Sequence, residues 1–219
     1  LTSEVRIIGG ARFESTEIGI VNDAEASATW FPPGSVTPTQ LNPGDADVTF
    51  ERADKLPSIG VEYKPFKEVT LRASYNQTIS GQTFKELTPI LQQEFLGGSI
   101  FIGNPDLQMS SVENYDLRAD YAPYEGGLIS VSWFKKDIKD PIEYVQRIGT
   151  FNFTTAVNYP EGELSGLEIE VRQNLGHFVD AFAGLSIGGN ATFIESEVTL
   201  PDDEVAAFNL PNIMAPTTK

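Results

Sequence analysis

Residues 115–121 read YDLRADY, in which every second side chain is apolar and every side chain between two apolar ones is charged. A period of two is typical of a β-strand with two unlike faces, because successive side chains of a strand point to opposite sides of its sheet. The same alternation returns in the stretches 69–76, 129–133, 167–172 and 185–193. Taken together, one face of these five stretches carries no charge, whereas the other carries charges of both signs. The sequence therefore predicts an all-β protein whose sheet has one apolar and one polar face.

Two further strands are predicted over residues 4–19 and 56–63, and the links between the seven strands alternate in length. Short links lie at 64–68, 122–127 and 176–182, and long links rich in Pro and Gly lie at 21–54, 81–111 and 140–162. This alternation places the short turns at one end of the sheet and the long loops at the other. Transmembrane β-barrels of the outer membrane have this arrangement, with short periplasmic turns and long extracellular loops.

The composition excludes several classes of site. The 31 acidic and 15 basic residues give a net charge of -16, which argues against a nucleic-acid partner because phosphate binding needs clustered Lys and Arg. The chain has no cysteine and a single histidine, His177, which excludes a disulfide framework, a thiolate zinc site and a multi-histidine metal site. We therefore predict no metal, no cofactor and no catalytic residue. A transmembrane helix is excluded because no run of about 18 apolar residues occurs.

A location in a lipid bilayer would explain why the predicted sheet has one apolar face and one charged face. The apolar face would meet lipid and the polar face would meet a wet lumen. Every backbone polar group must then pair between strands, so the sheet has to close. Because seven strands are too few to enclose a wide polar lumen, we expect the chain to form an arc of a larger barrel. The charges expected to face the lumen are Arg72, Asp116, Arg118, Asp120, Glu168, Glu170 and Arg172.

Five phrases carry a resemblance to a known family. They are LRASYNQTISGQTFKELTP (71–89), GNPDLQMSSVENYDLRADY (103–121), LISVSWFKKDIKDPI (128–142), LSGLEIEVRQNL (164–175) and NATFIESEV (190–198). In this order and spacing they resemble the C-terminal barrel half of TonB-dependent outer-membrane receptors, over roughly residues 55–200. The resemblance implies an antiparallel meander within a large barrel of about 22 strands, located in the bacterial outer membrane.

The resemblance also implies a function, namely energy-coupled uptake of a substrate such as a siderophore, a vitamin or an oligosaccharide. Such receptors carry an N-terminal plug domain and a short energy-coupling box, and most outer-membrane barrels end in an aromatic strand. Residues 1–219 match none of these three features, so they are expected to be a partial barrel domain. The implied partners are outer-membrane lipid, an unidentified small molecule or oligosaccharide, and the TonB energy-coupling protein acting through the N-terminal region that this sequence lacks.

Aromatic residues in the long loops are candidates for ligand contact, because exposed rings stack on sugars and on hydrophobic parts of ligands. The candidates are Trp30, Phe31, Phe84, Phe95 and Phe101. The alternative is that these rings pack within their own loops, and the sequence leaves both possibilities open.

Carboxylates suggest two weaker hypotheses. Glu168 and Glu170 share one strand face, and their expected separation resembles that of the two catalytic carboxylates of glycoside hydrolases. The favoured interpretation is that both are hydrated charges in the lumen, balanced by Arg172. Acidic loop residues such as Asp45 and Asp47 offer oxygen ligands for calcium. Because no EF-hand or repeat spacing accompanies them, solvated acidic loops are favoured.

The alternative from another class of protein is a soluble, secreted β-sandwich that binds carbohydrate, or a carbohydrate-active enzyme built on that scaffold. A sandwich would pack the apolar face against a second sheet, whereas a barrel would turn the same side chains toward lipid. The side chains that distinguish the two are Leu71, Leu117, Val131, Ile169 and Ile187.

Overall fold

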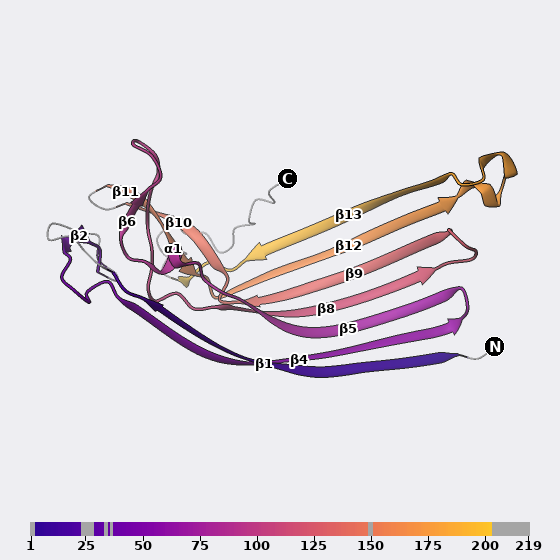
Figure 1. Ribbon diagram of the computed structural model, residues 1–219, viewed down its shortest axis with the longest axis horizontal. Coiled ribbons are helices and arrows are strands. Elements are labelled where there is room, and N and C mark those ends of the chain that lie inside the picture. Colours follow the sequence, from indigo (N-terminus) through magenta and orange to yellow (C-terminus); the bar gives the residue numbers. More distant parts are fainter. Residues whose placement is uncertain (1–2, 23–28, 33–34, 36, 149–150, 203–219) are drawn as a thin grey trace.

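The computed structural model describes residues 3–22, 29–32, 35, 37–148 and 151–202, and its largest element is a sheet of seven strands. In spatial order these strands are β1 (Glu4–Ile20), β4 (Val48–Phe66), β5 (Val69–Ser80), β8 (Ser110–Tyr121), β9 (Leu128–Lys139), β12 (Glu161–Asn174) and β13 (Ser186–Val198). Each strand is antiparallel to its neighbours, and the spatial order follows the chain (Figure 1). The predicted strands and their meander are therefore confirmed.

Several strands extend further toward the long loops than the alternation predicts. β4 begins at Val48, inside the predicted loop 21–54, and Val48 pairs with Ile20 of β1. The sequence signal fails in this segment because charged side chains such as Glu51 and Arg52 occupy both of its faces. β1 has 17 residues and β4 has 19, more than the roughly 9–11 residues that cross a bilayer. Both strands are therefore long enough to project beyond the membrane on the loop side.

The uncharged face of the sheet forms a continuous apolar belt. One row of directly opposed residues is Val5, Tyr63, Leu71, Ala119, Val131, Ile169 and Ala191. The next row is Ile7, Val61, Ala73, Leu117, Trp133, Leu167 and Phe193. We call these two rows the apolar belt. Leu117 is 52% exposed and Val131 is 42% exposed, so the belt is not buried against other described parts of the chain.

This exposure contradicts the β-sandwich alternative. A sandwich buries the inward face of each sheet in a core about 10 Å thick. The five side chains that would distinguish the two folds are all exposed in the structure: Leu71, Leu117, Val131, Ile169 and Ile187. In a transmembrane barrel, an apolar surface of this kind contacts lipid and needs no second sheet to cover it.

The long loops gather at one end of the sheet, on the left of Figure 1, and have secondary structure of their own. The elements are β2 (Thr29–Trp30), β3 (Thr39–Gln40), α1 (Phe84–Leu87), β6 (Leu91–Gln93), β7 (Ile100–Ile102), β10 (Ile142–Ile148) and β11 (Asn152–Asn158). β10, β11, β7 and β6 form a four-stranded sheet that joins the loop after β5 to the loop after β9. Among the described residues, no helix has the length and apolarity to cross a membrane.

The short turns lie at the opposite end of the sheet, on the right of Figure 1. The last of them is longer than the predicted link 176–182 and contains two 3-10 turns, η1 (Leu175–His177) and η2 (Asp180–Phe182). The ring of His177 stacks on Tyr124 of the preceding turn, with centroids 3.7 Å apart and planes at 4°. The predicted separation of short turns from long loops is therefore confirmed.

Candidate functional site

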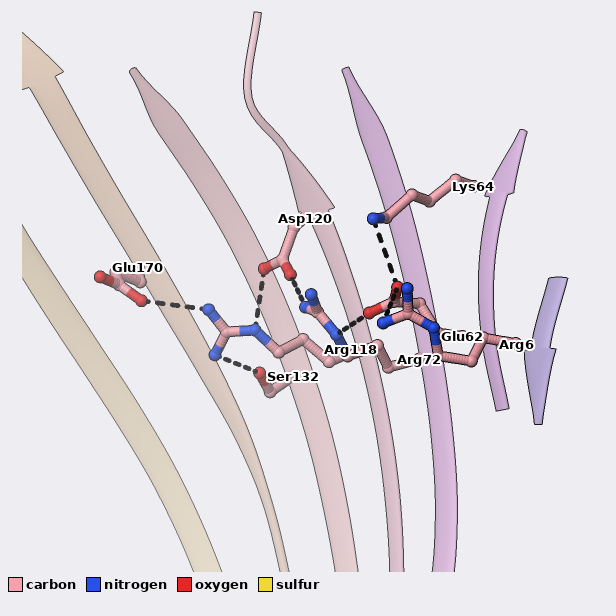
Figure 2. A network of polar contacts seen from close by, with 8 residues as sticks. All are labelled: Arg6, Glu62, Lys64, Arg72, Arg118, Asp120, Ser132 and Glu170. Atoms are coloured by element: carbon pink, nitrogen blue, oxygen red, sulfur yellow. Dashed lines mark hydrogen bonds and ion pairs between the residues drawn. The ribbon is translucent and has the colours of Figure 1, made fainter. Parts of the chain in front are cut away.

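A chain of ion pairs crosses the charged face of the sheet (Figure 2). It begins at Arg6 of β1, whose Nη1 lies 3.9 Å from Oε1 of Glu62 on β4. Glu62 also accepts from Lys64 Nζ at 3.3 Å and from Arg72 Nε of β5 at 3.0 Å. Arg72 then reaches Asp120 on β8 through its Nη1. Four neighbouring strands are thus linked by alternating positive and negative side chains.

Arg118 continues the chain toward β12. Its Nε lies 2.8 Å from Asp120 Oδ1, its Nη2 lies 3.3 Å from Glu170 Oε2, and its Nη1 lies 3.4 Å from the hydroxyl of Ser132. Glu170 is also paired with Arg172, at 2.8 Å. We call this set of ion-paired side chains the charged row; its members are Arg6, Glu62, Lys64, Arg72, Arg118, Asp120, Glu170 and Arg172. Glu170 is thus held between two guanidinium groups, which agrees with the favoured interpretation of Glu168 and Glu170 as charges balanced by arginine.

Five of the seven charges expected to face the lumen belong to this charged row, namely Arg72, Arg118, Asp120, Glu170 and Arg172. The other two lie on the same face. Asp116 accepts from the Ser74 hydroxyl at 3.4 Å, and Glu168 is opposite Ser132 and Thr192 in the register. The orientation of these charges toward a lumen stays a prediction.

The long loops pack around a small core of their own. Leu87, Phe101, Leu107 and Ala156 form a buried cluster, against which Ile18 and other residues pack. The segment GNPDL, residues 103–107, joins the elements around this core through hydrogen bonds. Gly103 N–H donates to Thr88 O at 3.1 Å, and Asn104 N–H donates to Glu86 O at 2.6 Å. The Asn104 side chain then donates to Ala156 O at 3.1 Å, so this phrase ties α1 to β11.

Glu86 is the most connected acidic residue of the loop core. It lies in the first turn of α1 and forms a capping box with Thr83, in which each side chain accepts from the other residue's backbone N–H. Its Oε1 also accepts from the Tyr144 hydroxyl of β10 at 2.6 Å. Burial alone would raise the pKa of Glu86, but the hydrogen bonds from Thr83 and Tyr144 outweigh burial and hold the pKa below its usual value. The same contact, with some burial, raises the pKa of Tyr144 to about 12.

Three long loops meet at a hollow of about 300 Å3. Phe31 comes from the loop after β1, Asp106 from the loop after β5, and Arg147 and Phe153 from the loop after β9. The Phe31 and Phe153 rings lie 6.2 Å apart, and Phe151 makes edge contacts with both. A hollow with aromatic walls and a few charged groups has the chemistry of a small-molecule site.

The five aromatic candidates differ in how far their side chains are exposed to solvent. Phe31 and Phe101 are buried in the packing of the loops, and Trp30 is half-buried. Phe84 and Phe95 are 69% and 68% exposed. Sequence reasoning missed Phe151, Phe153 and Arg147, although the phrase FNF at 151–153 offers the same aromatic signal in the third long loop. The contribution of these side chains to ligand binding stays a prediction.

The described residues contain no group of three or more His, Cys, Asp or Glu side chains placed to hold a metal ion. The calcium hypothesis thus gains no support from the loops that the structure shows.

The fold is that of part of the wall of a transmembrane β-barrel with long loops at one end. The family model described as "TonB dependent receptor-like, beta-barrel" matches residues 1–215, and this chain belongs to that family. Members are outer-membrane proteins of Gram-negative bacteria, which gives the location of this chain. No curated protein sequence matches the chain significantly.

Solved structures of the same fold agree with this assignment. The siderophore receptor PirA from Pseudomonas aeruginosa aligns with a TM-score of 0.51 and 16% identity, covering 69% of this chain and 29% of its own. The copper transporter OprC aligns with a TM-score of 0.60 and 15% identity, covering 88% of this chain and 26% of its own. The Serratia marcescens hemophore receptor HasR, in complex with hemophore HasA and heme, aligns with a TM-score of 0.52 and 13% identity. This alignment covers 90% of this chain and 39% of the HasR chain. This chain thus spans about a quarter to two fifths of these receptors and transporters.

Proposed function

We propose that residues 1–219 form part of the barrel wall and of the substrate-facing loops of an outer-membrane receptor that takes up its substrate with energy supplied through TonB. One observation carries the proposal most strongly. The seven-stranded sheet carries an exposed apolar belt on one face, and five of its strands carry a row of paired charges on the other face. Such a sheet suits a wall between lipid and a wet passage, and it requires no covalent chemistry.

The passage side of this wall would be lined by the charged row. Because each guanidinium in it has a carboxylate partner, the row presents alternating charges of both signs. During passage, a polar substrate would replace part of its hydration water by contacts with these charged groups. Energy coupling would act through a region outside this chain, so the plug and the TonB contact belong to the proposal about the whole receptor.

The substrate would first meet the long loops. The hollow bounded by Phe31, Phe153, Asp106 and Arg147 supports this, because aromatic walls with a few charged groups suit a ligand that has both flat apolar and polar parts. Siderophores, vitamins and oligosaccharides remain the substrate classes of the proposal. The exposed rings of Phe84 and Phe95 extend the apolar surface available on the second loop.

Uptake by cells that express the full-length receptor tests the proposal. Labelled ferric enterobactin, a labelled vitamin, heme and copper would be supplied as probes, with an oligosaccharide panel, in cells with and without TonB. We expect saturable uptake of a probe from one class, lost when TonB is absent. Uptake that persists unchanged without TonB would contradict the proposed energy coupling.

Substitutions then locate the site. Replacing both exposed rings, Phe84→Ser with Phe95→Ser, should lower affinity for that probe and leave the fold intact. The matched control is Phe178→Ser, since Phe178 is 64% exposed but lies at the short-turn end of the sheet. Equal losses in the two variants would contradict a loop site.

A further inference from the structure

The loop between β6 and β7 contains a tight turn with an apolar side chain at its centre. Gly98 N–H donates to Phe95 O at 2.9 Å, and Gly97 has a φ of 84°, as in a type II β-turn. The third position of such a turn needs a positive φ, which glycine adopts without strain. Leu96 therefore occupies the second position of the turn, next to Gly97.

Contacts at the base of the turn hold it in one conformation. Gln93 Nε2 donates to Gly98 O at 2.8 Å, and Lys85 Nζ of α1 lies 3.2 Å from Glu94 Oε1. The Phe95 ring folds back over Gly98, where an added Cβ would lie 3.1 Å from its Cζ. Leu96 has no comparable support, since it is 99% exposed. The loop thus forms an ordered turn that presents a leucine side chain to solvent.

The shape of this tip indicates the kind of partner that it fits. Leu96 is not a single exposed apolar residue, because the same loop also exposes Phe84, Leu91 and Phe95. Such groups of exposed apolar side chains mark interaction sites. Small-molecule sites are concave and enclose most of their ligand, whereas the β6–β7 loop projects from the loop end of the sheet (Figure 1). A projecting apolar tip suits a pocket on a partner protein.

The charge of the loop end indicates the charge of that partner. The described residues of the three long loops carry seven carboxylates and two basic side chains. The carboxylates are those of Asp45, Asp47, Glu86, Glu94, Asp106, Asp140 and Glu143, and the basic side chains are Lys85 and Arg147. Glu94 directly precedes the turn, and its side chain is 79% exposed. A negative field of this kind favours the approach of a positively charged protein.

We propose that the tip formed by Phe95 and Leu96 docks into an apolar pocket with a basic rim on an extracellular protein. This site goes beyond the proposed uptake function, because a free small substrate needs no protein at the tip. Phe95 is also a candidate for substrate contact, so the test changes Leu96 alone. Loss of the Leu96 side chain should leave uptake of free substrate in place, and the two proposals therefore fail independently.

Photo-crosslinking tests what lies against the tip, in cells that express the full-length receptor with Leu96→p-benzoylphenylalanine. The probe is the secreted protein of the source bacterium, separated by ion exchange into a basic and an acidic fraction. We expect irradiation to attach one protein of the basic fraction, which mass spectrometry identifies. The proposal is overturned if nothing is attached, or if only an acidic protein, lipopolysaccharide, the receptor's own loops or a second receptor copy is attached.

Binding of the identified protein, once purified, to the full-length receptor then measures the contribution of the tip. Leu96→Ser should weaken binding about 10- to 100-fold, the change expected when one leucine side chain is no longer buried. The matched control is Val21→Ser, since Val21 is 82% exposed and follows β1 at the same end of the sheet. The control should bind as the unsubstituted receptor does, and equal affinities of the two variants would overturn the proposal.

Two further measurements complete the test. Added salt should slow association, because it screens the attraction between the acidic loops and a basic rim. An association rate that does not depend on salt would overturn the assignment of that rim. Uptake of free substrate should be the same with Leu96→Ser as without it, and a loss of uptake would show that the tip belongs to the substrate site instead. Circular dichroism of each variant confirms that its barrel is folded.

Discussion

The Tyr144 hydroxyl donates a hydrogen bond to Glu86 Oε1 at 2.6 Å, and this contact joins β10 to α1 across two different long loops. Glu86 is buried, whereas Tyr144 is largely exposed. The contact therefore fastens the outer surface of one loop to the buried capping box of the other. It makes the loops one packed unit above the barrel wall.

The variant Tyr144→Phe should loosen this unit. A hydrogen bond to a charged acceptor contributes about 1.5–3 kcal/mol, and the exposure of Tyr144 reduces the expected loss to about 1 kcal/mol. Hydrogen exchange at the amides of residues 83–88 would report faster opening. Unchanged exchange would show that the capping box alone holds α1.

The same contact predicts a pH dependence with a defined sign. Because folding lowers the pKa of Glu86 from 4.5, its contribution is present above that value and is lost as the pH falls through the lowered folded pKa. Because folding raises the pKa of Tyr144 from 10.0 to about 12, its contribution is present below 10.0 and is lost as the pH rises through about 12. Exchange of the loop amides, corrected for intrinsic rates, should therefore be slowest between these limits. Protection that increases toward pH 3 would contradict the assignment.

Gly103→Ala should disrupt the loop core. A methyl group at this position would lie 2.7 Å from the Thr88 backbone nitrogen, and backbone has little freedom to move away. We expect a loss of roughly 2 kcal/mol or more in the stability of the loop unit. Gly19→Ala is the control, because nothing lies within 4 Å of its added carbon. Limited proteolysis should cleave the loops of the first variant faster than those of the second.

Asp120 separates two like charges. Arg72 and Arg118 are directly opposite in the register, and each pairs with Asp120. Asp120→Asn should therefore cost about 2–3 kcal/mol, since it removes a carboxylate that is 12% exposed and leaves two guanidinium groups facing one another. Asp116→Asn, which removes only a 3.4 Å contact with Ser74, should cost far less. Chemical unfolding of both variants in detergent measures the difference.

The buried and exposed loop aromatics should behave differently. Phe31 packs against Phe151 and Phe153, so Phe31→Ala should cost about 3–5 kcal/mol of loop stability. Phe84 is exposed, so Phe84→Ala should change stability by no more than about 0.5 kcal/mol. Hydrogen exchange of the loops in each variant checks both values. A large loss from Phe84→Ala would show packing that the structure does not contain.

The sequence predicted the membrane-spanning part better than the loops, for a physical reason. Where one strand face is apolar and the other is charged, as around Leu117 and Arg118, the two kinds of side chain alternate strictly along the sequence. Toward the long loops both faces of β4 carry charged side chains, so this strand extends to Val48 without an apolar–polar pattern. The two faces of the sheet were therefore predictable, whereas the ends of the strands were not.

The loop site illustrates the same limit. Its contacts are long-range, such as the pairing of Glu86 with Tyr144 and the support of Gly103 by Thr88. No local period reveals such contacts. Phe31 was found from its residue type, but its place between Phe151 and Phe153 depends on how two loops meet.

The central claim is that odd-numbered residues of the central strands face lipid and even-numbered ones face the lumen. Residues 1–219 contain no cysteine, so single spin labels can be placed by Val131→Cys, Ser132→Cys, Glu168→Cys and Ile169→Cys in the full-length receptor, with any cysteine elsewhere in the receptor replaced by serine. After reconstitution into bilayers, the accessibility of each label to oxygen and to a water-soluble nickel chelate is measured. The account predicts that oxygen, which concentrates in lipid, reaches labels at 131 and 169 best, whereas the nickel chelate reaches 132 and 168 better. Accessibility that does not alternate, or that alternates in the opposite sense, would contradict it.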